Sequence, residues 1–471
     1  MANNDRVADK EPEMAKPERD KCGQYSQGAR HGATSVGSNE EEVHCSNSKL
    51  LESVVDRSNL WKALRRVKAN QGNAGIDGMT VDELHPWLSA NWETIKEKLL
   101  NGSYQPQPVK AVDIPKPDGG VRRLGIPTVI DRLIQQAITQ VLTPIFDPHF
   151  SNNSYGFRAG KNAKQAVRQA QQYQQEGKRW VVDMDLEKFF DVVNHDILMQ
   201  CLRERIEDKA LLNLIGKYLR GGMMINGLES QRIKGTPQGG PLSPLLSNIL
   251  LDRFDRELAR RGHSYVRYAD DCNIYLRSAK AADRVLKSVT SWIEKHLRLR
   301  VNRDKSASGR PWQRKFLGFS FLSQRSAKIR IAPKSVKNFK AKVKAEMRKG
   351  RGRNVKRLVN ETLNPILRGW INYYRITETK GVIEELDGWL RRRLRNILWR
   401  QWKKPKTRRK KLMQLGIHET SASKTAYSGR GQWFSSALPP VNGALSKKYF
   451  DQLGLLNLQK ELKFAEQLDL L

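Results

Sequence analysis

The pattern of apolar and polar positions divides the chain into segments of different character. Residues 1–50 are polar and almost without aromatic side chains, a composition that is typical of a disordered leader. From Leu51 onward the apolar residues recur at helical spacing, which predicts a helix over 50–70. After a glycine-containing loop, the same spacing predicts a second helix over 81–102. We therefore expect a helical extension over residues 51–105.

Strand-like and helix-like segments alternate between residues 106 and 324. Two short runs around a Pro-Asp-Gly-Gly turn, VKAVDIPK and VRRLGIP, predict a β-hairpin. RWVVDMD has the apolar run of a buried strand, and SYVRYADDCNIYLRS predicts two strands folded about Asp270 and Asp271. This alternation predicts a chain of the α/β (α+β) class. Helices are expected at RLIQQAITQVLTPIF, LEKFFDVV, LLSNILLDRFDRELARR and AADRVLKSVTSWIEKHL, and a further strand at KFLGFSFL.

After about Ser326 the chain becomes a series of basic helices. In residues 391–411, 12 of the 21 residues are Lys or Arg and none is acidic. Trp389, Trp399 and Trp402 lie among these cations. Aromatic rings among cations suit stacking on bases and contact with phosphates, so we expect these three rings to meet nucleic acid.

Composition narrows the class of partner. The chain has 85 Lys and Arg against 49 Asp and Glu, a formal net charge of +36, which indicates a polyanion partner. No stretch approaches the roughly 20 apolar residues of a membrane span, and the N-terminus lacks the apolar core of a signal peptide. The 4 cysteines lie far apart without a C-x-x-C pair, which argues against a zinc site and a disulfide framework. We expect a soluble intracellular protein that binds nucleic acid.

The strongest candidate chemistry is a group of carboxylates. Asp270 and Asp271 repel each other at the tip of an apolar hairpin, where a structural turn would favour Asn-Gly or Asp-Gly. A cation would explain the pair; a solvated acidic turn is the alternative. Asp185 ends the RWVVDMD strand, and Asp183 lies on the same face two residues earlier. Together they offer an all-oxygen site for Mg²⁺, and two such ions can activate a 3′-hydroxyl and stabilise leaving pyrophosphate.

Basic residues complete such a site. Lys116 and Arg122 flank the Pro-Asp-Gly-Gly turn and could lean over a triphosphate, with arginine offering a bidentate fork. Without the carboxylates, a surface hairpin with ordinary charges would be the simpler interpretation. Phosphoryl transfer depends mostly on positioning and charge neutralisation, so carboxylates and cations are most of what it requires.

An ordered series of motifs resembles one enzyme family. Tyr268-Ala269-Asp270-Asp271 resembles the Y-x-D-D box of reverse transcriptases, and Asp185 with LEKFFD resembles their first metal-binding motif. GTPQGGPLSPLLSNI and KFLGF resemble the two blocks that accompany these motifs. NAGIDGMTVDEL, IPKPDGGVRRLGIP, LNPILRGWINYYR and RRRLRNILWRQWKKPKTRRKKLMQLGI resemble group II intron-encoded reverse transcriptases in particular. The resemblance runs from about residue 50 to near the C-terminus.

The resemblance implies roles for single residues. Asp185, Asp270 and Asp271 would be the catalytic ligands of two Mg²⁺ ions, and Phe190 would reject the 2′-hydroxyl of a ribonucleotide. Gln238 would lie near the incoming nucleotide. Lys116 and Arg122 would hold the triphosphate; Arg123 would share that work or face solvent; Lys305 is a weaker candidate for protonating pyrophosphate.

The family also implies the architecture. We expect a right-hand polymerase fold with fingers and palm over 106–324, the palm an antiparallel sheet with helices. An α-helical thumb/maturase domain over 325–390 and a basic DNA-binding region over 391–471 would follow. Gly369, Trp370, Tyr373 and Tyr374 are expected to pack the thumb helices. The implied partners are group II intron RNA, an RNA template, a DNA primer or target, and dNTPs.

Alternatives remain at the level of the sequence. No cysteine pair or His-rich motif follows the basic region, and His418 stands alone, so we expect no H-N-H endonuclease. The alternatives are a related polymerase that serves phage defence or another host function, and a non-enzymatic RNA-binding splicing chaperone. The carboxylates argue against the chaperone. A bacterial cytoplasmic location, at the nucleoid when target DNA is bound, follows from the family.

Overall fold

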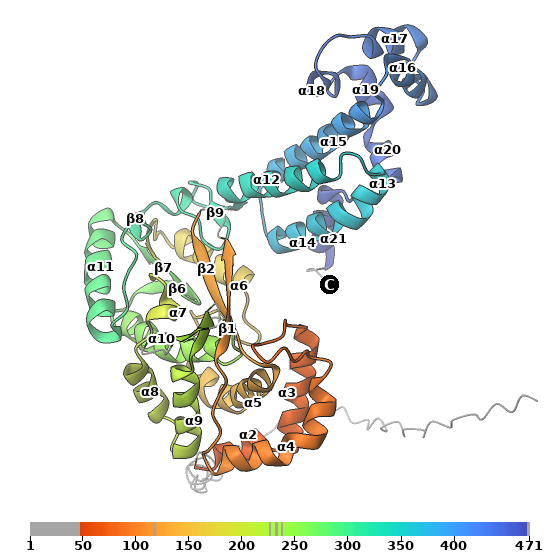
Figure 1. Cartoon of the computed structure of the whole chain (residues 1–471). Coiled ribbons are helices and arrows are strands. Elements are labelled where there is room, and N and C mark those ends of the chain that lie inside the picture. The colour runs from red at the N-terminus through yellow and green to blue at the C-terminus, as the bar shows by residue number, and fades with distance from the viewer. Residues whose placement is uncertain (1–47, 116–118, 226–227, 231–233, 237–238, 469–471) are drawn as a thin grey trace, which may run out of the picture. The chain divides into compact units, whose positions relative to one another are not determined.

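The computed structural model describes residues 48–115, 119–225, 228–230, 234–236 and 239–468 (Figure 1). The leader predicted for residues 1–50 lies almost entirely outside these ranges, as do Lys116 and Gln238. None of the helices in the described ranges has the length and apolarity that crossing a membrane requires.

The first predicted helix is in fact two. Asp56 has an extended ψ of 140°, and its carboxylate accepts hydrogen bonds from the backbone N–H groups of Ser58 at 2.8 Å and Asn59 at 3.3 Å. It therefore ends one helix and caps the next. The expectation of one continuous helix was wrong because apolar spacing does not register a capping aspartate. The helices are α2 (Leu50–Val55), α3 (Arg57–Asn70) and α4 (Leu84–Leu100).

The predicted hairpin is confirmed. β1 (Val109–Pro115) and β2 (Val121–Ile126) pair antiparallel from Lys110 opposite Ile126 to Pro115 opposite Val121. β1 also pairs parallel with β4 (Met223–Ile225), which pairs antiparallel with β5 (Leu228–Ser230), giving a mixed sheet in the order β2-β1-β4-β5. The largely buried helix α5 (Val129–Phe146) begins directly after the hairpin, with Thr128 as its N-cap.

A second, antiparallel sheet carries most of the candidate carboxylates. Its order is β6-β7-β3-β8, with β6 at Ser264–Tyr268, β7 at Asp271–Leu276, β3 at Trp180–Met184 and β8 at Ala307–Gly309. The two strands predicted about Asp270 and Asp271 pair with Tyr268 opposite Asp271. This confirms the predicted antiparallel palm.

The two faces of this sheet contribute to two different apolar cores. Val182 and Met184 of β3 belong to the main apolar core, together with Ile274 of β7 and the adjoining helices α10 and α11. Side chains alternate along a strand, so Asp183 points to the other face, where Val181 and Tyr275 join a second apolar core. The helices of this region are α6 (Ala163–Gln175), α7 (Phe189–Val192), α8 (His195–Arg203), α9 (Lys209–Arg220), α10 (Ser243–Arg260) and α11 (Ala279–Trp292), with short turns η1 (Asp147–His149), η2 (Ile293–Leu297) and η3 (Pro311–Gln313).

The remaining chain is helical, as predicted, after a two-stranded ribbon of β9 (Phe319–Phe321) and β10 (Ile329–Ile331). The second apolar core continues through these helices. Trp399 and Trp402 are 1 % and 9 % exposed, so the expectation that they meet nucleic acid was wrong. Both rings are buried in the second apolar core. The helices are α12 (Pro333–Lys349), α13 (Val355–Arg357), η4 (Leu358–Leu363), α14 (Asn364–Tyr374), α15 (Gly381–Gln401), α16 (Pro405–Gln414), α17 (Glu419–Ala426), α18 (Gln432–Ser435), α19 (Pro439–Ala444), α20 (Lys447–Gln452) and α21 (Leu458–Leu468).

Candidate active site

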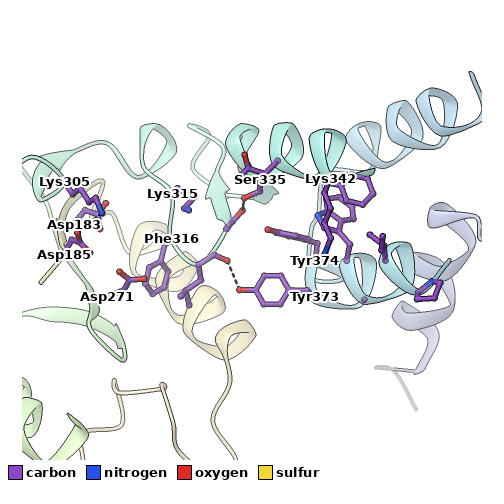
Figure 2. Close-up of a pocket in the computed structure, with 18 residues that line it drawn as sticks. Asp183, Asp185, Asp271, Lys305, Lys315, Phe316, Ser335, Lys342, Tyr373 and Tyr374 are labelled. Atoms are coloured by element: carbon purple, nitrogen blue, oxygen red, sulfur yellow. Dashed lines mark hydrogen bonds and ion pairs between the residues drawn. The ribbon is translucent and has the colours of Figure 1, made fainter. Parts of the chain in front are cut away.

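Three of the four predicted aspartates line one cavity. Asp183, Asp185 and Asp271 face a cavity of about 1030 Å³ whose other walls come from the segment 315–318 and from helices α12 and α14 (Figure 2). Asp183 and Asp271 share a sheet face, because Asp183 lies opposite Asn273 and two residues separate Asn273 from Asp271. The topology thus gathers, on one wall, carboxylates that lie more than eighty residues apart in the sequence.

Asp185 is held by a turn from a distant part of the chain. Its backbone N–H lies 2.9 Å from Ser306 Oγ, and its carbonyl accepts from the backbone N–H of Asn302 at 2.9 Å. The same turn brings Lys305 Nζ to 3.6 Å from Asp185 Oδ2. Lys305 therefore belongs at the site, although its contact is with a carboxylate.

The tip of the Asp270–Asp271 hairpin is built around Ala269, whose φ is +58°. This left-handed conformation is unfavourable for a residue with a Cβ and needs support from its surroundings. Arg267 supplies it by donating a hydrogen bond to the Ala269 carbonyl at 3.0 Å. Arg267 is itself fixed by a buried ion pair with Asp255 of α10 at 2.5 Å, and by Asn248 Oδ1 at 3.0 Å.

Burial changes the protonation of these carboxyl groups. Burial, together with the negative charges of Asp270 and Asp185, raises the pKa of Asp271 to about 7. Burial also raises the pKa of Asp183 to about 6, against the opposing charge of Arg314. The pKa of Asp270 is raised by burial too, while Arg122 lowers it. Crowded, desolvated carboxylates of this kind are a site that a divalent cation would stabilise.

No closed metal cage is preformed within the described residues: no three His, Cys, Asp or Glu side chains converge into one. The donor set, oxygen atoms of aspartates at a cavity wall, nevertheless fits a hard ion such as Mg²⁺. Asp183 has a partner of its own, because Asn273, with its amide turned to donate, lies 3.0 Å from Asp183 Oδ1.

Arg122 and Arg123 are neighbours on β2, so their side chains point to opposite faces of the hairpin. The charge of Arg122 lowers the pKa of Asp270, so this cation lies within electrostatic range of that carboxyl group, and its contact with a triphosphate stays a prediction. Arg123 forms an ion pair with Asp113 across the hairpin at 2.8 Å. Arg123 is exposed, as one of its two suggested roles requires, and its contact with a triphosphate is not tested.

Phe190 lies beside the glycine-rich loop. It is 9 % exposed and its ring meets that of Phe189 edge-on at 5.2 Å. The Phe190 carbonyl accepts from the backbone N–H of Thr236 at 2.6 Å. Gly235 has φ +90°, and a Cβ there would lie 2.8 Å from the Phe190 carbonyl oxygen, so only glycine allows this approach. Gly235 and Thr236 are thus held directly against Phe190.

Comparison with known proteins decides the family. Residues 114–321 match the family "Reverse transcriptase (RNA-dependent DNA polymerase)", and residues 336–416 match "Group II intron, maturase-specific domain". Protein YkfC of Escherichia coli (strain K12) is 32 % identical over 298 residues, covering 55 % of this chain and 78 % of YkfC. The chain belongs to the group II intron-encoded reverse transcriptases.

Other relatives of this reverse transcriptase are matched over smaller shares. Group II intron-encoded protein LtrA of Lactococcus lactis subsp. cremoris is 35 % identical over 197 residues, which are 42 % of this chain and 33 % of LtrA. The putative COX1/OXI3 intron 1 protein of Saccharomyces cerevisiae is 31 % identical over 221 residues, 47 % of this chain and 26 % of that protein. The solved "Partial Cas6-RT-Cas1--Cas2 complex" aligns with 52 % of this chain and 42 % of its own at a TM-score of 0.35 and 27 % identity.

The family assignment confirms an RNA-directed DNA polymerase with a maturase domain. The roles of single residues stay predictions, as do the domain limits. Sequence reasoning missed the residues behind the reverse transcriptase site: Arg267, Asp255, Asn248 and Ser306. One signal was available, because Arg267 lies in an otherwise apolar strand and a buried charge requires a partner.

Proposed function

We propose that this reverse transcriptase extends a DNA primer on an RNA template by two-metal nucleotidyl transfer at Asp185, Asp270 and Asp271. The supporting observation is the cavity wall on which Asp185 and Asp271 lie together, beside a hairpin tip held by Arg267. When bound, two Mg²⁺ ions would lower the pKa of the primer 3′-hydroxyl and neutralise the leaving pyrophosphate. The ligands suit Mg²⁺ by their oxygen chemistry.

The protein's own groups would orient the reactants. Lys116 and Arg122 would bind the triphosphate, and Gln238 would contact the incoming nucleotide. Phe190 would lie under the sugar and exclude a 2′-hydroxyl, a role that suits a ring fixed by core packing on a backbone whose carbonyl accepts from the Thr236 N–H. Lys305, whose ammonium lies 3.6 Å from Asp185, would protonate the leaving pyrophosphate.

The second half of the proposal concerns the intron. The maturase-specific region 336–416 would bind group II intron RNA and help it fold for splicing, and the basic region 391–471 would bind target DNA during intron movement. A net charge of +36 supports affinity for these polyanions. We place the protein in the bacterial cytoplasm, and at the nucleoid when it is bound to target DNA.

The test is primer extension on an RNA template with Mg²⁺ and dNTPs, comparing the wild type with Asp270→Ala/Asp271→Ala. We expect cDNA from the wild type alone, while both proteins bind intron RNA with similar affinity. Loss of RNA binding in the variant would mean that the aspartates are structural. Extension by the variant at the wild-type rate would refute the assigned site.

A further inference from the structure

A short turn near the C-terminus presents two aromatic rings to solvent. Trp433 and Phe434 of α18 are 38 % and 45 % exposed. The next two residues, Ser435 and Ser436, are fully buried, and their hydroxyls donate to backbone carbonyls within the turn, Ser436 Oγ to the Trp433 carbonyl at 2.7 Å. The rings therefore stand on an anchored turn. The exposure of the two rings is therefore a feature of an ordered turn and not the result of loose packing.

Arginines surround both rings. The Cζ atoms of Arg392 and Arg393, on the neighbouring helix α15, lie 4.1 and 4.4 Å from the centre of the Trp433 ring. Arg430 Cζ lies 4.5 Å from the centre of the Phe434 ring. Arg392 also donates to the Trp433 carbonyl at 3.3 Å, which ties α18 to α15. We call these five residues the aromatic–arginine surface. Cation–π contact fixes the guanidinium groups beside the rings.

Among the described residues, no carboxylate pairs with the arginines of this surface. In the part of the chain that the structure describes, neither Arg392 nor Arg393 forms an ion pair, and the Nε of each is buried without an acceptor. The pKa of Arg393 is lowered by burial and then by the charges of Arg392 and Arg351. Burial and the neighbouring arginines also lower the pKa of Arg395 to about 10. Such crowding of like charges favours an anionic partner.

We propose that the aromatic–arginine surface binds unpaired bases of a single-stranded nucleic acid. Bases would stack on the exposed Phe434 ring and on the guanidinium planes that the Trp433 ring supports, and the adjacent phosphates would meet the arginines. In a duplex the base faces are already stacked on one another, so a duplex could use only the cations. The inference rests on the proposed function and deepens it, because it states which form of nucleic acid the basic C-terminal region prefers.

The test measures binding by fluorescence anisotropy with the full-length protein. Labelled oligothymidine, oligouridine and a DNA duplex serve as probes for the wild type and for Trp433→Ala/Phe434→Ala. Stacking contributes about 1–3 kcal/mol per base, so the double variant should bind both single strands about tenfold more weakly or worse. Duplex affinity should change less than about twofold, and the salt dependence should stay the same because no charge is removed.

Two controls separate this role from a folding defect. Trp61→Ala removes a tryptophan that is 43 % exposed on α3, outside the basic region, and should leave binding unchanged. Trp433→Phe keeps a ring at the turn and should retain most of the single-strand affinity. If the double variant loses affinity for only one of the two single-stranded probes, the proposal still holds, and that probe shows whether the surface binds DNA or RNA. Equal loss on the duplex, or no loss on either strand, would overturn it. Because primer extension on a pre-annealed template is measured separately, failure of this inference leaves the polymerase assignment untouched.

Discussion

Arg267 donates a hydrogen bond to the carbonyl of Ala269 at 3.0 Å, one residue before the first aspartate of the hairpin tip. The side chain that makes this contact is 1 % exposed and is paired with an equally buried Asp255. Through this contact, helix α10 fixes the backbone that carries Asp270 and Asp271. The position of the reacting carboxylates thus depends on a buried ion pair that never meets substrate.

Breaking the pair should damage both stability and activity. Asp255→Asn leaves the Arg267 charge buried and unpaired, which typically costs about 3–5 kcal/mol of unfolding free energy. The double variant Arg267→Met/Asp255→Leu should recover much of that stability, since no charge remains. It should still extend primers poorly, because the Ala269 carbonyl has lost its donor. Thermal unfolding and single-nucleotide incorporation measure the two effects. Recovery of activity together with stability would contradict the positioning role.

Gly156 should tolerate no side chain. A Cβ there would lie 2.3 Å from the backbone nitrogen of Ala269 and 3.0 Å from the carbonyl carbon of Tyr268. Gly156→Ala should therefore shift the hairpin tip and reduce the rate of nucleotide addition by tenfold or more, with intron RNA affinity little changed. Gly388→Ala is the matched control, because a Cβ at that helical position meets nothing within 4 Å. Alanine there should be neutral or slightly stabilising. Equal activity of the two variants would refute the steric argument.

Tyr373 links helix α14 to the turn beside the carboxylates. Its hydroxyl donates to the Leu317 carbonyl at 2.9 Å, a contact drawn in Figure 2, and Leu317 has a positive φ of +49°. A hydrogen bond of this kind contributes roughly 0.5–1.5 kcal/mol. Because Tyr373 and Leu317 both line the cavity of the carboxylates, Tyr373→Phe should loosen that wall and weaken primer–template binding by at most about tenfold, with nearly the same rate at saturation. Tyr427→Phe, at a ring that is 57 % exposed, should change neither quantity. A lower saturating rate with unchanged affinity would contradict this account.

The end of α10 should respond to pH. Glu257 accepts from Arg260 and Arg261, both at 2.7 Å, and the Arg260 hydrogen bond is the largest cause that holds its pKa at about 2. Because the folded pKa is depressed below the ordinary value of 4.5, the stabilisation is complete above that value and is lost as pH falls toward 2. Glu257→Gln should cost about 1 kcal/mol at pH 7, given partial solvent screening.

Urea unfolding at pH 7, 5 and 4 measures this cost. The difference in unfolding free energy between the wild type and Glu257→Gln should stay constant between pH 7 and about pH 5.5 and become smaller by pH 4. A gap that widens as the pH falls would mean that the carboxylate does not stabilise the fold through these arginines.

Local sequence patterns predicted the parts of the site that lie within single elements. The hairpin bearing Arg122 and the strands about Asp270 and Asp271 follow from alternation and turn residues, and both are confirmed. The interval of two residues that separates Asp183 from Asp185 places both at the same cavity wall. Family resemblance added the order of these parts along the chain.

The long-range contacts of the site could not be predicted from the sequence, because no local pattern encodes them. Ser306 reaches Asp185 across 121 residues, and Arg267 finds Asp255 only once α10 packs under the sheet. The same limit explains the error at Trp399 and Trp402, since a ring among cations can serve a core or a ligand equally well by composition. The burial of those rings and the exposure of Trp433 became visible only with the helices in place.

The most direct test of the polymerase assignment is single-turnover incorporation of one dNTP on an RNA–DNA primer-template. Asp185→Asn, Asp270→Asn and Asp271→Asn each preserve the side-chain shape and remove one charge, and exposed Asp304→Asn serves as control. We predict a rate loss of about 1000-fold or more for each of the three, equivalent to about 4 kcal/mol of transition-state stabilisation, with primer-template affinity within threefold of wild type. Incorporation within tenfold of the wild-type rate by any of the three would contradict the assignment.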